Sequence, residues 1–213
     1  AYVTFNANAY SREQLDFLFG YFERLQDAGA TGVIVSVPEA VEPAADCGLR
    51  VVASTMCGVY NAAIARVYGR LGCTRVIGPR DVGLDEIEAM VREAPEVEYE
   101  AFLMRNGCIF ADGSCLGRHF EGRNALCWDV RHARRENLVA PYGGERLDRE
   151  LSENALAYER FHRTACGLCA IWRLERAGVA AAKIVGRSDD SSFILRDIEA
   201  IVRNTAIART CAS

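Results

Sequence analysis

The sequence is short of lysine, of net charge and of long apolar runs, and each shortage excludes a class of protein. Its 213 residues carry a net charge of only −4, so there is no general basic field for nucleic acid. No apolar run is long enough for a transmembrane helix, and no basic stretch leads into an apolar one as in a signal peptide. We therefore expect a cytoplasmic protein without membrane insertion.

Lys183 is the only lysine among 25 basic residues, and all the others are arginine. A GC-rich coding background explains such a bias, and Lys183 is then a chance survivor. The other interpretation is that this position needs a compact ammonium, which a planar guanidinium does not replace. Both interpretations stay open at the level of sequence.

Three common catalytic patterns are also missing. No Gly-x-Gly-x-x-Gly follows the first expected strand, which counts against dinucleotide binding. Neither Gly-x-Ser-x-Gly nor His-Glu-x-x-His occurs, so the sequence predicts neither a serine nucleophile elbow nor a zinc-protease helix.

Cysteine, in contrast, is abundant, with nine in the chain. In a reducing cytosol, clustered thiols usually bind metal or take part in catalysis, and disulfides are the minority alternative. Four thiolates, the softest ligands a protein offers, are typical of an iron–sulfur or zinc site. Structural zinc favours closely spaced cysteine pairs, and only Cys166 and Cys169 are spaced in that way. The cysteines therefore favour an iron–sulfur site, with zinc as the alternative.

Elsewhere strands and helices are expected to alternate. Repeated β-α units predict a parallel sheet with right-handed crossovers, and we expect an α/β fold, a partial or modified TIM-like (β/α) barrel. A glycine- and arginine-rich insertion, about 104–166, follows a central strand, and the whole chain, 1–213, is expected to be one domain. Strands are predicted at 2–7, 32–37, 50–53, 75–77, 97–103 and 181–185, and helices at 11–28, 39–46, 61–71, 84–93, 167–176 and from 189 or 191 to about 204.

Several motifs together carry a family resemblance. The chain has Glu100-Ala-Phe102 on an expected strand, then Cys108, then Gly113-Ser-Cys115. It continues with Gly122-Arg123-Asn124 before Cys127, and later with Ala177-Gly178-Val179 and Lys183-Ile184-Val185-Gly186-Arg187. In this order the motifs resemble the signature of the U32 peptidase family, and the resemblance covers nearly the whole chain.

The chain departs from the family pattern at several points. Met104-Arg105 stand where the family has His-Gly, Val185 replaces an acidic residue, and a second cysteine close behind Cys127 is absent. The family's opening Ala-Pro-Ala-Gly-Asn turn has no counterpart, and we count about six strands. The resemblance therefore implies a truncated barrel, or one completed by a homologous partner subunit.

The resemblance also implies a cofactor and an activity. Several family members are iron–sulfur proteins that support oxygen-independent hydroxylation of ubiquinone precursors or of bases in RNA. By this resemblance, Cys108, Cys115, Cys127 and Cys166 hold a [4Fe–4S] cluster, with Cys169 as the alternative fourth ligand. We expect a hydroxylase, or a subunit of one, that acts on a small aromatic quinone precursor or on an RNA base. The alternatives are a U32-type peptidase and a cluster-bearing scaffold without catalysis.

Four charged residues are further candidates. Glu100 is expected to point towards the site as a general base, and Lys183 is a second catalytic candidate. Each is alternatively a structural partner of an opposite charge. Arg123 and Arg187 are candidates for binding an anionic substrate by bidentate contacts, or else lie on a solvated face. Cys57 follows a strand and is expected near the barrel mouth.

Overall fold

The computed structural model describes residues 1–104, 112–114, 166–186 and 190–210. Six parallel strands form one sheet in the order β1-β2-β3-β4-β5-β6. The strands are β1 (Tyr2–Phe5), β2 (Gly32–Val35), β3 (Arg50–Ala53), β4 (Cys73–Ile77), β5 (Glu98–Phe102) and β6 (Ala181–Lys183). Because each strand pairs with the next along the chain, the order never reverses, as in a barrel and unlike a doubly wound sheet.

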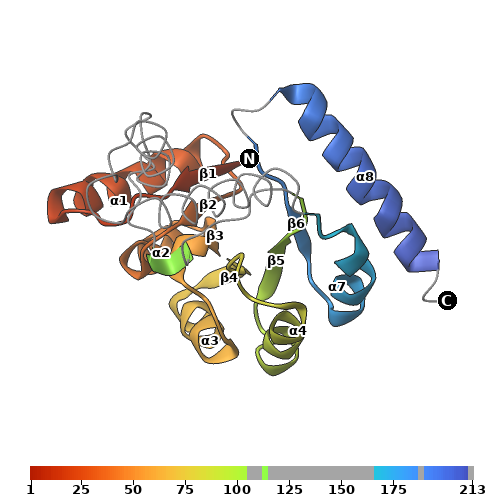
Figure 1. Ribbon diagram of the computed structural model, residues 1–213. Helices are drawn as coiled ribbons and strands as arrows, with labels where there is room; N and C mark the ends of the chain where they lie inside the picture. Colours follow the sequence, from red (N-terminus) through yellow and green to blue (C-terminus); the bar gives the residue numbers. More distant parts are fainter. Residues whose placement is uncertain (105–111, 115–165, 187–189, 211–213) are drawn as a thin grey trace, which may run out of the picture.

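Helices lie in a row along the outer side of the curled sheet, and the last helix packs against the helix before it (Figure 1). The α-helices are α1 (Arg12–Asp27), α2 (Val41–Asp46), α3 (Ala62–Leu71), α4 (Leu84–Glu93), α7 (Ile171–Ala177) and α8 (Ser191–Thr210). Short 3-10 turns are η1 (Pro38–Ala40), η2 (Thr55–Cys57), η3 (Asp112–Ser114) and η4 (Leu168–Ala170). The described part of the fold is thus a six-stranded half-barrel. None of its helices is both long and apolar enough to span a membrane.

Local signals set the helix boundaries. Ser11 and Gln14 form the capping box at the start of α1, since each side chain accepts a hydrogen bond from the other's backbone. Asn61 caps α3, and Gly72 ends it in the left-handed conformation that glycine favours. The Ser11 cap and the α4 boundaries are confirmed as predicted. The last helix is longer than expected, because α8 continues beyond residue 204 to Thr210.

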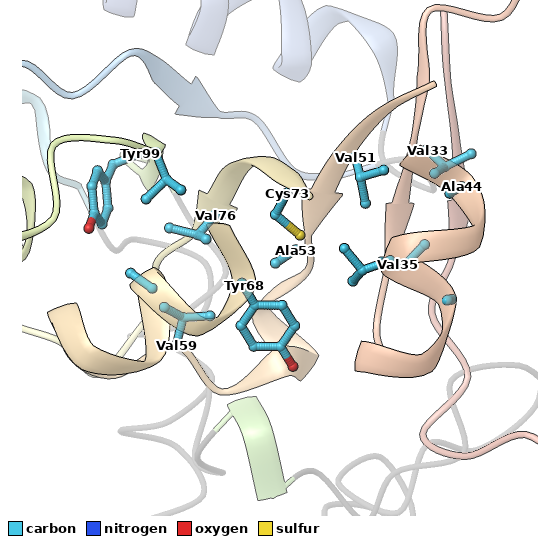
Figure 2. Packing of buried hydrophobic residues seen from close by; sticks show 14 of the residues in the cluster. Val33, Val35, Ala44, Val51, Ala53, Val59, Tyr68, Cys73, Val76 and Tyr99 are labelled. Carbon is cyan, nitrogen blue, oxygen red and sulfur yellow. The ribbon is translucent and has the colours of Figure 1, made fainter. Parts of the chain in front are cut away.

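The outer face of the sheet builds the main hydrophobic core. Side chains of β2, β3, β4 and β5 point towards the helices, and Figure 2 shows them together with Ala44 and Tyr68 from the helix layer. Val33, Val35 and Val51 are fully buried there. Since side chains alternate along a strand, the intervening residues lie on the opposite, inner face. That face carries the charged residues described below.

The prediction of a parallel α/β fold forming part of a barrel is therefore confirmed. The strands β1, β2, β5 and β6 end earlier than predicted, whereas β3 and β4 end at the predicted residues. The cysteine-bearing insertion lies largely outside the described residues, and the single domain and the partner subunit stay predictions. The described flanks of the insertion do meet, because Met104 and Cys166 form an antiparallel bridge. The residues that follow β5 therefore lie directly beside the residues that lead into α7.

Candidate functional site

Glu100 lies on the inner face of β5 between two cations. Its carboxylate is 3.4 Å from Nη1 of Arg75 on β4 and 3.3 Å from Nζ of Lys183 on β6. The Glu100 side chain is only 12 % exposed, so these two contacts replace much of its hydration. Glu100 and Lys183 were predicted as catalytic groups, and the fold brings them into direct contact from strands about eighty residues apart in the sequence.

The ion pairs extend beyond Glu100 across the inner face. Arg75 also pairs with Glu98 at 2.6 Å, and Arg50 of β3 reaches the same carboxylate at 3.2 Å. The hydrogen bond from Arg75 is the largest cause that lowers the pKa of Glu98, and the charge of Arg50 adds to it. A row of alternating charges therefore runs over β3, β4, β5 and β6. Lys183 is the last charge of this row, at the end that lies nearest the carboxyl edge of the sheet.

A second cluster, which we call the η3 anchor, consists of Arg80, Phe102, Asp112 and the Gly58–Gly113 contact. The Arg80 guanidinium stacks 4.1 Å from the Phe102 ring centroid and pairs with the buried Asp112 carboxylate. Asp112 also accepts a hydrogen bond from the Arg80 backbone amide at 2.8 Å. The two glycines touch so closely that a Cβ on Gly113 would lie 2.7 Å from the Gly58 Cα. The η3 turn is thereby held against the loops that follow β3 and β4.

The bridge between Met104 and Cys166 lies at the carboxyl end of β5. Gly167 donates its amide hydrogen to the carbonyl of Leu103, which fixes the returning chain beside the outgoing one. Cys166 and Cys169 are both exposed free thiols. In a (β/α) barrel, active sites are built at this carboxyl edge. The Met104–Cys166 bridge, the η3 anchor and Lys183 all lie at the carboxyl edge of the sheet.

The predicted site residues divide into those the structure describes and those it does not. Glu100, Lys183, Cys166 and Cys169 are described, whereas three predicted ligands and two predicted arginines lie outside the described residues: Cys108, Cys115, Cys127, Arg123 and Arg187. Within the described ranges, no three His, Cys, Asp or Glu side chains come close enough together to hold a metal ion. The cluster ligands accordingly stay predictions.

Cys57 lies in the η2 turn, which follows β3 as expected, but its thiol packs against the main core on the helix side. Its Sγ donates to the Val35 carbonyl at 3.3 Å, and the sulfur accepts a hydrogen bond from Tyr68. Burial raises the pKa of Cys57 to about 11, and burial likewise raises that of Cys73 to about 12. Both thiols are therefore protonated at neutral pH and behave as small apolar groups, Cys73 buried and Cys57 partly so.

Sequence reasoning did not single out Arg75, Arg80 or Asp112. Arg75 lies between Thr74 and the apolar pair Val-Ile in the strand Cys-Thr-Arg-Val-Ile, and a charge inside such a strand indicates a paired group. Arg80 and Asp112 have no comparable local signal, since their contact joins residues 32 apart in the chain.

Known proteins resemble most of this chain. The family model of peptidase family U32 matches residues 1–206. The tRNA hydroxylation protein P1 of Bacillus subtilis is 27 % identical over 206 residues, which cover 91 % of this chain and 46 % of that protein. The 23S rRNA 5-hydroxycytidine C2501 synthase of Escherichia coli is 27 % identical over 143 residues, which cover 67 % of this chain and 21 % of that protein.

A solved U32 peptidase shares 23 % identity, with a TM-score of 0.43 over 48 % of this chain and 45 % of that one. The chain spans less than half the length of the two hydroxylation proteins that it matches. The match of the family model to nearly all residues supports one conclusion. The chain belongs to peptidase family U32.

Proposed function

We propose that this chain is an iron–sulfur hydroxylase of RNA bases, or a part of one. The proposal rests on one observation: residues that are close to the cysteines in the sequence lie together at the carboxyl edge of the sheet. Ser114 directly precedes Cys115, and Cys108 is four residues from both Met104 and Asp112. Met104, the η3 anchor and Cys166 all lie at the carboxyl edge of the sheet, beside the end of the charged row at Lys183.

The chemistry of the donor set suits a cluster. Cys166 is an exposed free thiol, which leaves its sulfur accessible as a ligand. In this proposal Cys108, Cys115, Cys127 and Cys166 hold a [4Fe–4S] cluster, and zinc is the alternative metal. Cys169, three residues further on and equally exposed, is the competing fourth ligand. When bound, the cluster would transfer electrons or bind an oxygen donor.

The chain's own residues have separate roles in this proposal. Lys183 is a fixed positive charge at the mouth, suited to a phosphate or to negative charge that develops on a ring oxygen. The Glu100 carboxylate, held by Arg75 and Lys183, is the proton acceptor. Arg123 and Arg187 stay candidates for binding phosphate groups of the substrate. RNA is proposed as substrate because relatives are named for tRNA and rRNA hydroxylation.

The test begins with metal and acid-labile sulfide in anaerobically purified protein. We expect about four iron and four sulfide per chain, with a broad absorption band in the visible. Cys115→Ala should lose most of the iron, whereas Cys47→Ala, outside the insertion, should keep it. RNA from cells that express the chain should gain one oxygen atom on a base by nucleoside mass spectrometry, and the Cys115→Ala strain should not.

Other outcomes would replace the proposal. Zinc or no metal in the wild-type protein contradicts the cluster, and peptide cleavage that survives Cys115→Ala would favour a U32-type peptidase. Iron without any modified RNA leaves a quinone precursor as the substrate, or a scaffold without catalysis. Association with a homologous subunit that completes the half-barrel would appear as a stable heteromer when the two are expressed together.

A further inference from the structure

Arg75 lies between two carboxylates on the inner face of the sheet. Glu98 and Glu100 are two residues apart on β5, so their side chains point to the same face. They stand about 7 Å apart along the strand, close enough to repel each other. Arg75, opposite Glu98 in the register of β4 and β5, contacts both carboxylates, at 2.6 Å and 3.4 Å. The guanidinium thus offsets the repulsion between the two glutamates.

Different nitrogens of Arg75 make these two contacts. Its Nε and Nη2 both donate to Oε2 of Glu98, at 2.9 Å and 2.6 Å, whereas Nη1 donates to Oε2 of Glu100 at 3.4 Å. Glu98 is held in turn by Arg50, 3.2 Å away on β3. Arg75 is therefore fixed mainly by Glu98, and the remaining arm of its planar fork fixes one oxygen of Glu100.

The two oxygens of Glu100 consequently face different partners. Oε2 accepts a hydrogen bond from Arg75, and Oε1 lies 3.3 Å from Nζ of Lys183 on β6. The carboxylate cannot turn away from one cation without leaving the other. The exposed fraction of the side chain falls from 46 % at Arg50 to 20 % at Arg75 and 12 % at Glu100. Because ion pairs that are partly buried are screened least, the hold on Glu100 is the firmest part of the row.

The geometry points to Arg75 as the positioning residue of this site, which keeps Oε1 of Glu100 on Lys183 at the carboxyl edge. Without Arg75 the carboxylate is free to rotate, and the proton acceptor and the ammonium are no longer held at one distance. Glu98 has a supporting role, because it keeps the guanidinium from turning wholly towards Glu100 and competing with Lys183. The inference deepens the proposed function and rests on it for the assignment of Glu100 as proton acceptor.

Lys183 reports on this arrangement directly, because it is the only lysine in the chain. Anaerobically purified protein labelled with ¹³C-lysine therefore gives one Cε signal, and its NMR order parameter measures how firmly the ammonium is held. In the wild type we expect a value above about 0.6, below which a group counts as flexible. Glu100→Gln, which removes the charged partner, should bring the value below this limit. Arg75→Gln should do the same, although the change is made two strands away.

The direction of the effect separates positioning from charge alone. If Arg75 were only a neighbouring cation, its removal would leave Glu100 wholly to Lys183, and the order parameter would stay the same or rise. Glu98→Gln should also lower the order parameter, and it replaces Arg75→Gln in the test if that variant does not fold. The matched control is Arg92→Gln on α4, which removes a side chain that is 70 % exposed and should leave the signal unchanged.

An order parameter in Arg75→Gln that equals or exceeds that of the wild type would overturn the inference, and so would a flexible Lys183 in the wild type. These results are independent of iron and of RNA. A chain without iron in which Arg75→Gln loosens Lys183 retains the positioning role and loses the proposed function. In a chain that modifies RNA, Arg75→Gln should keep its iron and lower the modified fraction at least about tenfold, because general base catalysis contributes about 10²–10⁴-fold. Full modification by Arg75→Gln would retain the proposed function and overturn the positioning role.

Discussion

At the scale of single residues, Glu100 depends most on its neighbours, because two cations stabilise a carboxylate that is only 12 % exposed. Glu100→Gln leaves Arg75 and Lys183 without this charge, and we expect a loss of about 1–3 kcal/mol in the free energy of unfolding. Urea denaturation measures this loss. Glu96→Gln, in an exposed pair with Arg66, should cost less than about 1 kcal/mol. Equal losses for the two variants would contradict a special role of Glu100 in the fold.

Thiol reactivity tests the fourth cluster ligand at the same scale. Cys166 and Cys169 are both exposed, so both should be alkylated rapidly by iodoacetamide in metal-free protein. In cluster-loaded protein, Cys169 should still react while Cys166 is protected, as read by peptide mass spectrometry. Cys57 and Cys73, whose pKa values burial raises, should stay unmodified in both forms. The reverse pattern, with Cys169 protected, would assign the fourth ligand to Cys169.

At the scale of elements, the η3 anchor joins the insertion to the half-barrel. Gly113→Ala would place a Cβ 2.7 Å from the Gly58 Cα, so one of the two backbones must move. We expect this variant to bind less than half the iron of the wild type, measured by metal analysis, because the turn directly before Cys115 is displaced.

The matched substitution is Gly20→Ala in α1, where an added Cβ meets nothing within 4 Å. There alanine should stabilise the helix by about 0.5–1 kcal/mol and leave the iron content unchanged. If Gly113→Ala also binds iron normally, the anchor does not position the cysteines.

At the scale of the whole molecule, ion pairs between elements couple stability to pH. The hydrogen bond from Arg75 lowers the pKa of Glu98, and that from Arg173 on α7 lowers the pKa of Glu88 on α4. A depressed carboxyl pKa stabilises the fold above the unfolded value near 4.5, and this stability disappears as the pH falls through the folded pKa.

Urea unfolding between pH 7 and pH 3 should therefore show stability that falls steadily below about pH 4.5. Glu98→Gln should be less stable than the wild type at pH 7 and should lose less stability on acidification. An identical pH dependence of the two proteins would show that Glu98 does not contribute to the acid transition.

Much of the fold could be predicted because its signals are local. Ser11 and Gln14 are three residues apart, and the capping box they form needs nothing from the rest of the chain. Gly72 and Gly178 end helices in the left-handed conformation, which glycine adopts without strain. The far end of α8 had no such signal, and its contacts with α7, including the pair between Arg209 and Glu175, extend the helix beyond the predicted end.

The sequence by itself determined the alternation of strands and helices, the family, and the cysteines and charges available for chemistry, because periodicity and motifs are properties of neighbouring residues. Only the tertiary structure decided which of these groups meet. The pairing of Glu100 with Lys183 and Arg75, and of Arg80 with Asp112, joins residues of different loops and strands. Such contacts arise when parallel strands bring distant segments to the same edge, and no local pattern encodes them.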